Sequence, residues 1–187
     1  MNTDYLLNII TAPVADGYFP EQFIEECNNF KNINYFKYSI PESESLLRFK
    51  HVIPEQWHRW FETYIQLNKD GQFPSLWPFT QEAIAFDFRQ QLDDFNSDTE
   101  LFALGSDPSG DWFVMTQDSG SMVYLCDQYA HNLYDGWKDP NHLLAWACRS
   151  ALADENNLTK EAVLNYWTTR NEKADQATIE RIADNLN

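Results

Sequence analysis

Residues 101–126 constrain the fold most, because short apolar runs alternate there with segments rich in turn residues. Apolar runs of this length between turns that contain Gly, Ser, Asp and Pro are typical of an antiparallel meander. Gly110 and Gly120 stand where such turns need a positive φ angle. We therefore predict antiparallel strands at about 101–126, with turns centred on Pro108 to Gly110 and on Ser119 to Gly120. The predicted strands are residues 101–104, 112–116 and 122–126.

A helix is predicted directly after Ile53-Pro54, because proline suits the first turn of a helix and apolar residues then recur with helical spacing. We expect this helix to run to about Asn68. Its apolar face consists of Trp57, Trp60, Phe61, Tyr64 and Ile65. Core packing of these rings is favoured over a sugar-binding site or an aromatic cage. The same expectation covers three tryptophans in other periodic segments, Trp112, Trp146 and Trp167.

Further helices are predicted on both sides of the meander. Before it, apolar residues recur at helical spacing from Pro20 and again up to about Asn96; these residues are Phe23, Cys27 and Phe30, then Ile84, Phe88, Leu92 and Phe95. After Pro140 the helical period returns in three segments. Their apolar residues are Leu144, Ala147, Cys148, Ala151 and Leu152, then Val163, Tyr166 and Trp167, then Ile179, Ile182, Ala183 and Leu186.

The order of helices, then strands, then helices predicts the α+β class. We expect an antiparallel sheet packed against helices, with a helical C-terminal extension. No internal repeat or Pro/Gly-rich linker divides the chain, which favours a single domain over 1–187. In this interpretation, residues beyond about 155 form a helical appendage of that domain.

The charge of the chain restricts its partners. The sequence has 13 basic and 29 acidic residues, for a net charge of −16. Nucleic-acid binding requires clustered Lys and Arg, so this balance argues against a nucleic-acid binder and favours a basic protein partner. Neither a signal peptide nor a run of about 18 apolar residues is present, which predicts a cytoplasmic protein that does not contact a membrane. The cysteines, Cys27, Cys126 and Cys148, form no CxxC pair and are expected as buried thiols.

No catalytic or metal-binding pattern emerges from the titratable residues. The four histidines, His51, His58, His131 and His142, form neither an HxH nor an HExxH pattern. No serine sits in a G-x-S-x-G elbow, and no glycine-rich loop carries the lysine of a phosphate site. Asp107, Asp111 and Asp118 could converge as oxygen ligands at one end of the meander, but the calcium-loop spacing is absent. We predict no catalytic residue, no metal and no cofactor.

An acidic stretch is the remaining candidate site. No Lys or Arg occurs between Arg89 and Lys138. The stretch is either a solvated surface that gives solubility or an anionic docking face. For docking we favour the carboxylates on turns, Asp107, Asp111 and Asp118, because they project from a rigid sheet and lose little entropy on binding. The other candidates are Asp93, Asp94, Asp98 and Glu100, and the stretch also contains Asp127 and Asp135.

The stretch from Leu101 to Trp146 resembles the SUKH superfamily. The resemblance rests on an apolar strand that enters a Gly-containing turn, followed by further strands and a helix. Its segments are Leu101-Phe-Ala-Leu-Gly105, Gly110-Asp-Trp-Phe-Val, Asp118-Ser-Gly, Val123-Tyr-Leu and Leu143-Leu-Ala-Trp, with Ile53-Pro-Glu-Gln-Trp upstream. The resemblance implies a helical N-terminal part against a twisted sheet, no catalytic apparatus and function through a protein interface.

Many bacterial members of that superfamily are immunity proteins for polymorphic toxins. The resemblance therefore implies a non-catalytic domain that binds and neutralises a toxin in bacterial competition. A toxin that attacks nucleic acid would present a basic cleft, to which an acidic partner is steered. The alternative function is an intracellular regulatory or adaptor protein that binds a small molecule or a protein. An enzyme is less expected, because the sequence contains no constellation of titratable groups for one.

Overall fold

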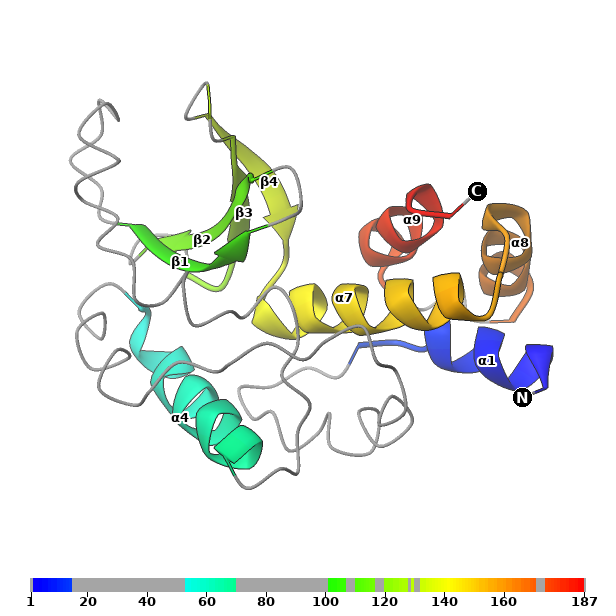
Figure 1. The fold of residues 1–187 in the computed structure, drawn as a ribbon, viewed down its shortest axis with the longest axis horizontal. Helices are drawn as coiled ribbons and strands as arrows, with labels where there is room; N and C mark the ends of the chain where they lie inside the picture. Colours follow the sequence, from blue (N-terminus) through cyan, green and yellow to red (C-terminus); the bar gives the residue numbers. More distant parts are fainter. Residues whose placement is uncertain are drawn as a thin grey trace.

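The α+β fold predicted from the sequence is present, with an antiparallel sheet packed with helices (Figure 1). The computed structural model describes residues 2–14, 53–69, 101–106, 110–116, 120–127, 129, 132–170 and 174–186. Within these ranges the side chains of 63–69, 101–106 and 116 are not described. The helices predicted around Phe23 to Phe30 and Ile84 to Phe95 lie outside the described residues. Among the described helices, none has both the length and the apolar character needed to cross a bilayer.

The sheet has four antiparallel strands in the order β1-β2-β3-β4. They are β1 (Leu101–Ser106), β2 (Trp112–Thr116), β3 (Val123–Cys126) and β4 (Leu133–Trp137). The first three confirm the predicted meander, although β1 continues two residues beyond the predicted 101–104. Gly110 and Gly120 have φ angles of 96° and 64°, which confirms the positive φ predicted for both turns. The fourth strand was not predicted from the sequence.

A bulge in the β3–β4 pair explains why position 136 is a glycine. The register shifts between Val123 and Tyr124, which pair with Trp137 and Asp135 and leave Gly136 as the extra residue. A Cβ atom on Gly136 would lie 2.2 Å from the carbonyl oxygen of Val123. Only glycine therefore permits this close approach of the two backbones.

Helix α4 (Glu55–Lys69) confirms the helix predicted after Pro54. Trp57, Trp60 and Phe61 are fully buried, as the apolar spacing predicts. The start of the helix is tied to the β2–β3 turn, because the Trp57 indole N–H donates to the Ser121 hydroxyl oxygen at 3.2 Å. The predicted core positions Tyr64 and Ile65 have no described side chains.

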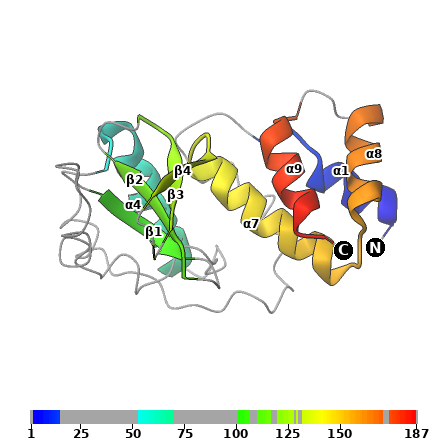
Figure 2. The ribbon, with the colours of Figure 1, turned by 90° about the horizontal axis from the view of Figure 1, so that it is seen from above.

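The remaining helices are α1 (Thr3–Ile10), α7 (Pro140–Glu155), α8 (Lys160–Arg170) and α9 (Gln176–Asp184). Figure 2 shows α7 running from the sheet to a group formed by α1, α8 and α9. Helix α7 begins at an Asp139 N-cap followed by Pro140, and α9 begins at an Asp175 N-cap. Helix α1 was not predicted; it begins at an Asn2 N-cap and buries Leu6, Leu7 and Ile10.

One hydrophobic core runs through the sheet and the helical group. Its buried residues come from α1, α4, β2, β3, β4, α7, α8 and α9. The apolar stripes predicted after Pro140 are mostly buried, with Ala151, Tyr166 and Trp167 only partly so. Arg149 is also buried, and its guanidinium donates to the carbonyl oxygens of Ile10 and Ala12 at 3.3 and 2.6 Å. This side chain satisfies carbonyl groups at the end of α1 and fixes α1 against α7.

Candidate functional site

The candidate interface lies where the β1–β2 and β3–β4 connections meet. In an antiparallel meander, alternate connections lie at the same end of the sheet. Asp111 precedes Trp112, which pairs with Cys126, and Cys126 pairs in turn with Leu133. Asp111 and Asp127 therefore lie at the same sheet end. The described part of the β2–β3 turn, Gly120 and Ser121, lies at the opposite end.

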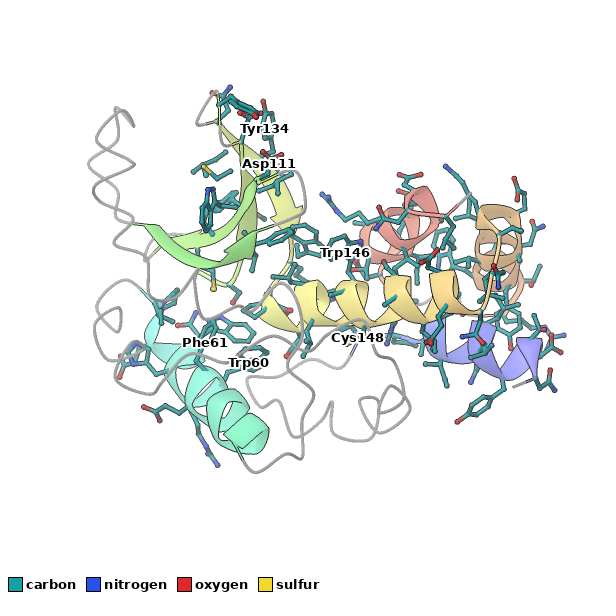
Figure 3. All side chains as sticks on the ribbon, viewed as in Figure 1. Trp60, Phe61, Asp111, Tyr134, Trp146 and Cys148 are labelled. Carbon is teal, nitrogen blue, oxygen red and sulfur yellow. The ribbon has the colours of Figure 1, made fainter. Side chains whose placement is uncertain are left out.

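We call this surface the hairpin end. It consists of Asp111, Asp127, Tyr129, Leu133, Tyr134 and Asp135. Figure 3 shows Asp111 and Tyr134 at this tip of the sheet, away from the helical group. All six residues fall in the stretch without Lys or Arg that the sequence singled out.

Large apolar side chains are exposed at the hairpin end. Tyr129 is 86% exposed, Tyr134 is 50% exposed and Leu133 is 38% exposed. The backbone N–H of Tyr129 donates to a carboxylate oxygen of Asp127 at 2.8 Å, which fixes the turn that carries this ring. A tyrosine ring has few rotatable bonds and therefore loses little conformational entropy when a partner covers it. Exposed tyrosine side chains of this kind are typical of protein interfaces.

Two carboxylates at this end of the sheet shift the pKa of a buried thiol. Burial, and then the negative charges of Asp127 and Asp111, raise the pKa of the Cys126 thiol to about 11. Both carboxylates therefore act on the same buried sulfur. At neutral pH the thiol stays protonated, so Cys126 is not an activated nucleophile. Cys126 and Cys148 are buried, as predicted, and Cys27 lies outside the described residues.

The histidines that the structure describes have structural roles. The ring Nε2 of His58 lies 2.8 Å from the carbonyl oxygen of Ile53, at the start of α4. The ring Nδ1 of His142 lies 2.7 Å from a carboxylate oxygen of Asp139, and the same oxygen accepts the His142 backbone N–H. Within the described ranges, no three His, Cys, Asp or Glu side chains gather to form a metal site. His51 and His131 lie outside these ranges.

The predicted site residues are only partly described. Asp111 is half-buried at the hairpin end. The other predicted carboxylates, Asp107, Asp118, Asp93, Asp94, Asp98 and Glu100, lie outside the described residues. Sequence reasoning missed Tyr129, Leu133 and Tyr134. The available signal was the occurrence of three large apolar residues within a short, otherwise polar segment of the acidic stretch.

A second feature lies between the sheet and α9. A pocket of about 230 Å³ is lined by the rings of Phe113, Trp137 and Trp146, and by Leu125, Arg181 and Asp184. Trp57 and Trp60 are fully buried, as predicted, but Trp146 is only half-buried. Trp112 and Trp167 are also half-buried.

The three pocket rings contact one another. The ring centroids of Phe113 and Trp137 are 5.1 Å apart, those of Trp137 and Trp146 are 4.9 Å apart, and those of Phe113 and Trp146 are 6.0 Å apart.

Comparisons with protein-family models, with curated proteins and with solved structures found no match to this chain.

Proposed function

We propose that this chain is a non-catalytic protein-binding domain that docks a basic protein partner on the hairpin end. The observation that carries the proposal is the exposure of Tyr129 and Tyr134 beside the carboxylates of Asp111, Asp127 and Asp135. Tyrosine is enriched in interfaces because its ring buries a large area and its hydroxyl retains a hydrogen-bonding group. The proposed role requires no catalytic residue, metal or cofactor.

The charge of the chain supports a cationic partner. A net charge of −16 produces a long-range field that accelerates the approach of a positively charged protein. The carboxylates of the hairpin end would then face basic groups of the partner, while the tyrosines and Leu133 supply apolar contact area. Nucleic acid would be repelled by the same field.

For the class of partner, we propose a toxin domain, with a nuclease as the specific case. The resemblance of residues 101–146 to the SUKH superfamily supports this assignment, because many of its members are immunity proteins. An immunity protein works by covering or distorting its toxin, and it therefore acts in the cytoplasm of the cell that it protects. A nuclease offers a basic cleft that complements an acidic surface.

The test compares two variants with the same change in net charge. One variant neutralises the hairpin end through Asp111→Asn, Asp127→Asn and Asp135→Asn. The control neutralises three exposed carboxylates at the end of α7 and the start of α8, through Asp154→Asn, Glu155→Gln and Glu161→Gln. Partners retained from a lysate of the source cells are identified by mass spectrometry, purified, and measured for association rate at two ionic strengths.

The proposal predicts slower association for the hairpin-end variant and little change for the control. The difference should be largest at low salt, where screening is weakest. Equal slowing by both variants would show that only total charge matters. Unchanged association of the hairpin-end variant at low salt would reject this surface as the docking site. Thermal unfolding of both variants checks that the fold is retained.

A further inference from the structure

The pocket between the sheet and α9 is built from three separate parts of the chain. Phe113 comes from β2, Trp137 from the end of β4 and Trp146 from α7. Figure 3 shows Trp146 projecting from α7 toward the space between β4 and α9. The contacting rings are tilted to one another by 48° to 69° and together form an apolar wall, of the kind that receives an aromatic or branched apolar group.

Arg181 places a fixed positive charge at this wall. Its guanidinium lies 4.9 Å from the centroid of the Trp137 ring. One of its N–H groups donates to the carbonyl oxygen of Asp135 at 2.9 Å. Stacking on the ring and bonding to the backbone together hold the group in one orientation, so it is ordered before a ligand arrives.

The positive charge of Arg181 has no carboxylate partner among the described residues. A guanidinium carries five N–H donors, and the bond to Asp135 uses one of them. The carboxylate of Asp184, which also lines the pocket, accepts from Lys160 at 2.6 Å instead. In a chain with 29 acidic residues, a pocket-lining arginine without an acidic partner indicates an anion supplied from outside.

We propose that this pocket binds a small organic monocarboxylate whose apolar body is about one ring in size. The carboxylate accepts hydrogen bonds from Arg181, and the body packs against Phe113, Trp137 and Trp146. The volume of about 230 Å³ is below that of pockets for drug-sized ligands, which sets the size limit. A second negative group on the ligand would approach Asp184 and is disfavoured. This binding activity is separate from the docking proposed for the hairpin end.

Phenylacetate is the test probe, with the neutral phenylacetamide and the dianionic phenylmalonate as comparisons. A ligand of about ten non-hydrogen atoms should bind with a Kd below about 10 mM, which calorimetry and ligand-observed NMR can measure. We expect phenylacetate to bind about tenfold more tightly than phenylacetamide, because only the acid forms charge-assisted bonds with the guanidinium. Phenylmalonate should bind more weakly than phenylacetate.

The matched variants are Arg181→Gln and Arg170→Gln. Arg170 on α8 also stacks on an aromatic ring, 5.8 Å from the centroid of Tyr166, but it lies outside the pocket. Arg181→Gln should weaken phenylacetate binding about tenfold, and Arg170→Gln should leave it unchanged. In the parent protein, phenylacetate should shift the side-chain Nε–H NMR signal of Arg181 but not that of Arg170.

Three outcomes would overturn the proposal. The first is absence of saturable phenylacetate binding below about 10 mM. The second is equal affinity for phenylacetate and phenylacetamide, and the third is an equal effect of the two arginine variants. If Arg181→Gln does not fold, the NMR signals of the parent protein decide the question without any substitution.

Discussion

The indole N–H of Trp60 donates a hydrogen bond to Oδ1 of Asn141 at 2.7 Å, and both side chains are fully buried. The bond joins α4 to the first turn of α7 across 81 positions of sequence. It therefore connects a helix that packs on the β2–β3 turn with the helix that leads to α1, α8 and α9. Because both groups are removed from water, each relies on a protein partner for its hydrogen bond.

This contact predicts a graded loss of stability. Trp60→Ala or Phe61→Ala should lower the free energy of unfolding by about 3–5 kcal/mol, the usual loss for a buried aromatic side chain. Trp60→Phe retains a ring but removes the donor to Asn141, and it should cost about 1–3 kcal/mol. Urea denaturation of Trp60→Phe, Asn141→Leu and the double variant measures the coupling between the two residues. Losses below about 1 kcal/mol at both Trp60→Ala and Phe61→Ala would contradict the burial of this face.

Substitution by alanine should lower the free energy of unfolding by different amounts at Gly136 and at Gly120. A Cβ at Gly136 would meet the backbone of Val123 at 2.2 Å, and a backbone atom has little freedom to move away. Gly136→Ala should therefore destabilise the protein by about 3 kcal/mol or more, or prevent folding. At Gly120 no atom lies within 4 Å of the added Cβ, so only the positive φ of 64° is unfavourable. Gly120→Ala should cost about 1–2 kcal/mol.

Thermal and urea unfolding of both alanine variants check this difference. Gly120→Asn provides a further control, because asparagine tolerates a positive φ better than alanine does. Gly120→Asn should therefore retain more stability than Gly120→Ala. A Gly136→Ala variant as stable as the parent would show that the β3–β4 bulge has a different geometry.

The extent to which sequence predicted the fold depends on where each element obtains its stability. The helix after Pro54 and the three-stranded meander have their own periodicity and turn residues, so local sequence was sufficient. Helix α1 has only 8 residues, so its stability depends on packing against α7 and α8, and it buries Leu6, Leu7 and Ile10. Strand β4 lacks an alternating pattern, because three successive residues from Leu133 are exposed and Gly136 forms a bulge.

For the candidate sites too, the sequence predicted only the features that are visible in local sequence. Asp111 was predicted because a carboxylate on a turn within an acidic stretch is visible in sequence. The exposed rings of Tyr129 and Tyr134 depend on an unpredicted strand, so their role could not be inferred. The pocket brings Phe113 together with Arg181, which is distant in sequence, and only tertiary packing creates that proximity.

The N-cap of α9 predicts a dependence of stability on pH. Burial of the Asp175 carboxyl would raise its pKa, but hydrogen bonds from Thr178 and the electrostatic interactions with His142 and Lys138 outweigh burial and lower it. A carboxyl whose pKa is lower in the folded state stabilises the protein above its unfolded pKa of about 3.9. This contribution is lost as the pH falls through the lower, folded pKa.

The test uses Asp175→Asn, because asparagine also caps helices but carries no charge. At neutral pH the variant should be less stable than the parent by about 0.3–1 kcal/mol, the usual value of a charge at a helix terminus. The difference should vanish as the pH falls through the folded pKa of Asp175. Urea denaturation between neutral and acid pH measures it, with Asp154→Asn at an exposed carboxylate as the control. A difference that persists unchanged at acid pH would mean that the charge of Asp175 is not responsible.

The last prediction separates the roles of rings and charges at the hairpin end. Tyr129 is 86% exposed and Tyr134 is 50% exposed, so neither ring contributes much to the folded core. In a complex with the proposed basic partner, these rings would be covered, and their truncation should mainly increase the dissociation rate. Tyr129→Ala and Tyr134→Ala should each speed dissociation by about tenfold, whereas Asp135→Asn should mainly slow association at low salt.

Surface-plasmon kinetics with the purified partner at two ionic strengths distinguish these effects. The matched control is Tyr5→Ala, because Tyr5 on α1 is also 50% exposed but belongs to the helical group. Tyr5→Ala should leave both rates unchanged, and all three tyrosine variants should keep the thermal stability of the parent within about 0.5 kcal/mol. If Tyr5→Ala speeds dissociation as much as Tyr134→Ala does, the partner does not bind specifically at the hairpin end. If neither Tyr129→Ala nor Tyr134→Ala changes dissociation, the exposed rings are ordinary surface residues and the docking face lies elsewhere.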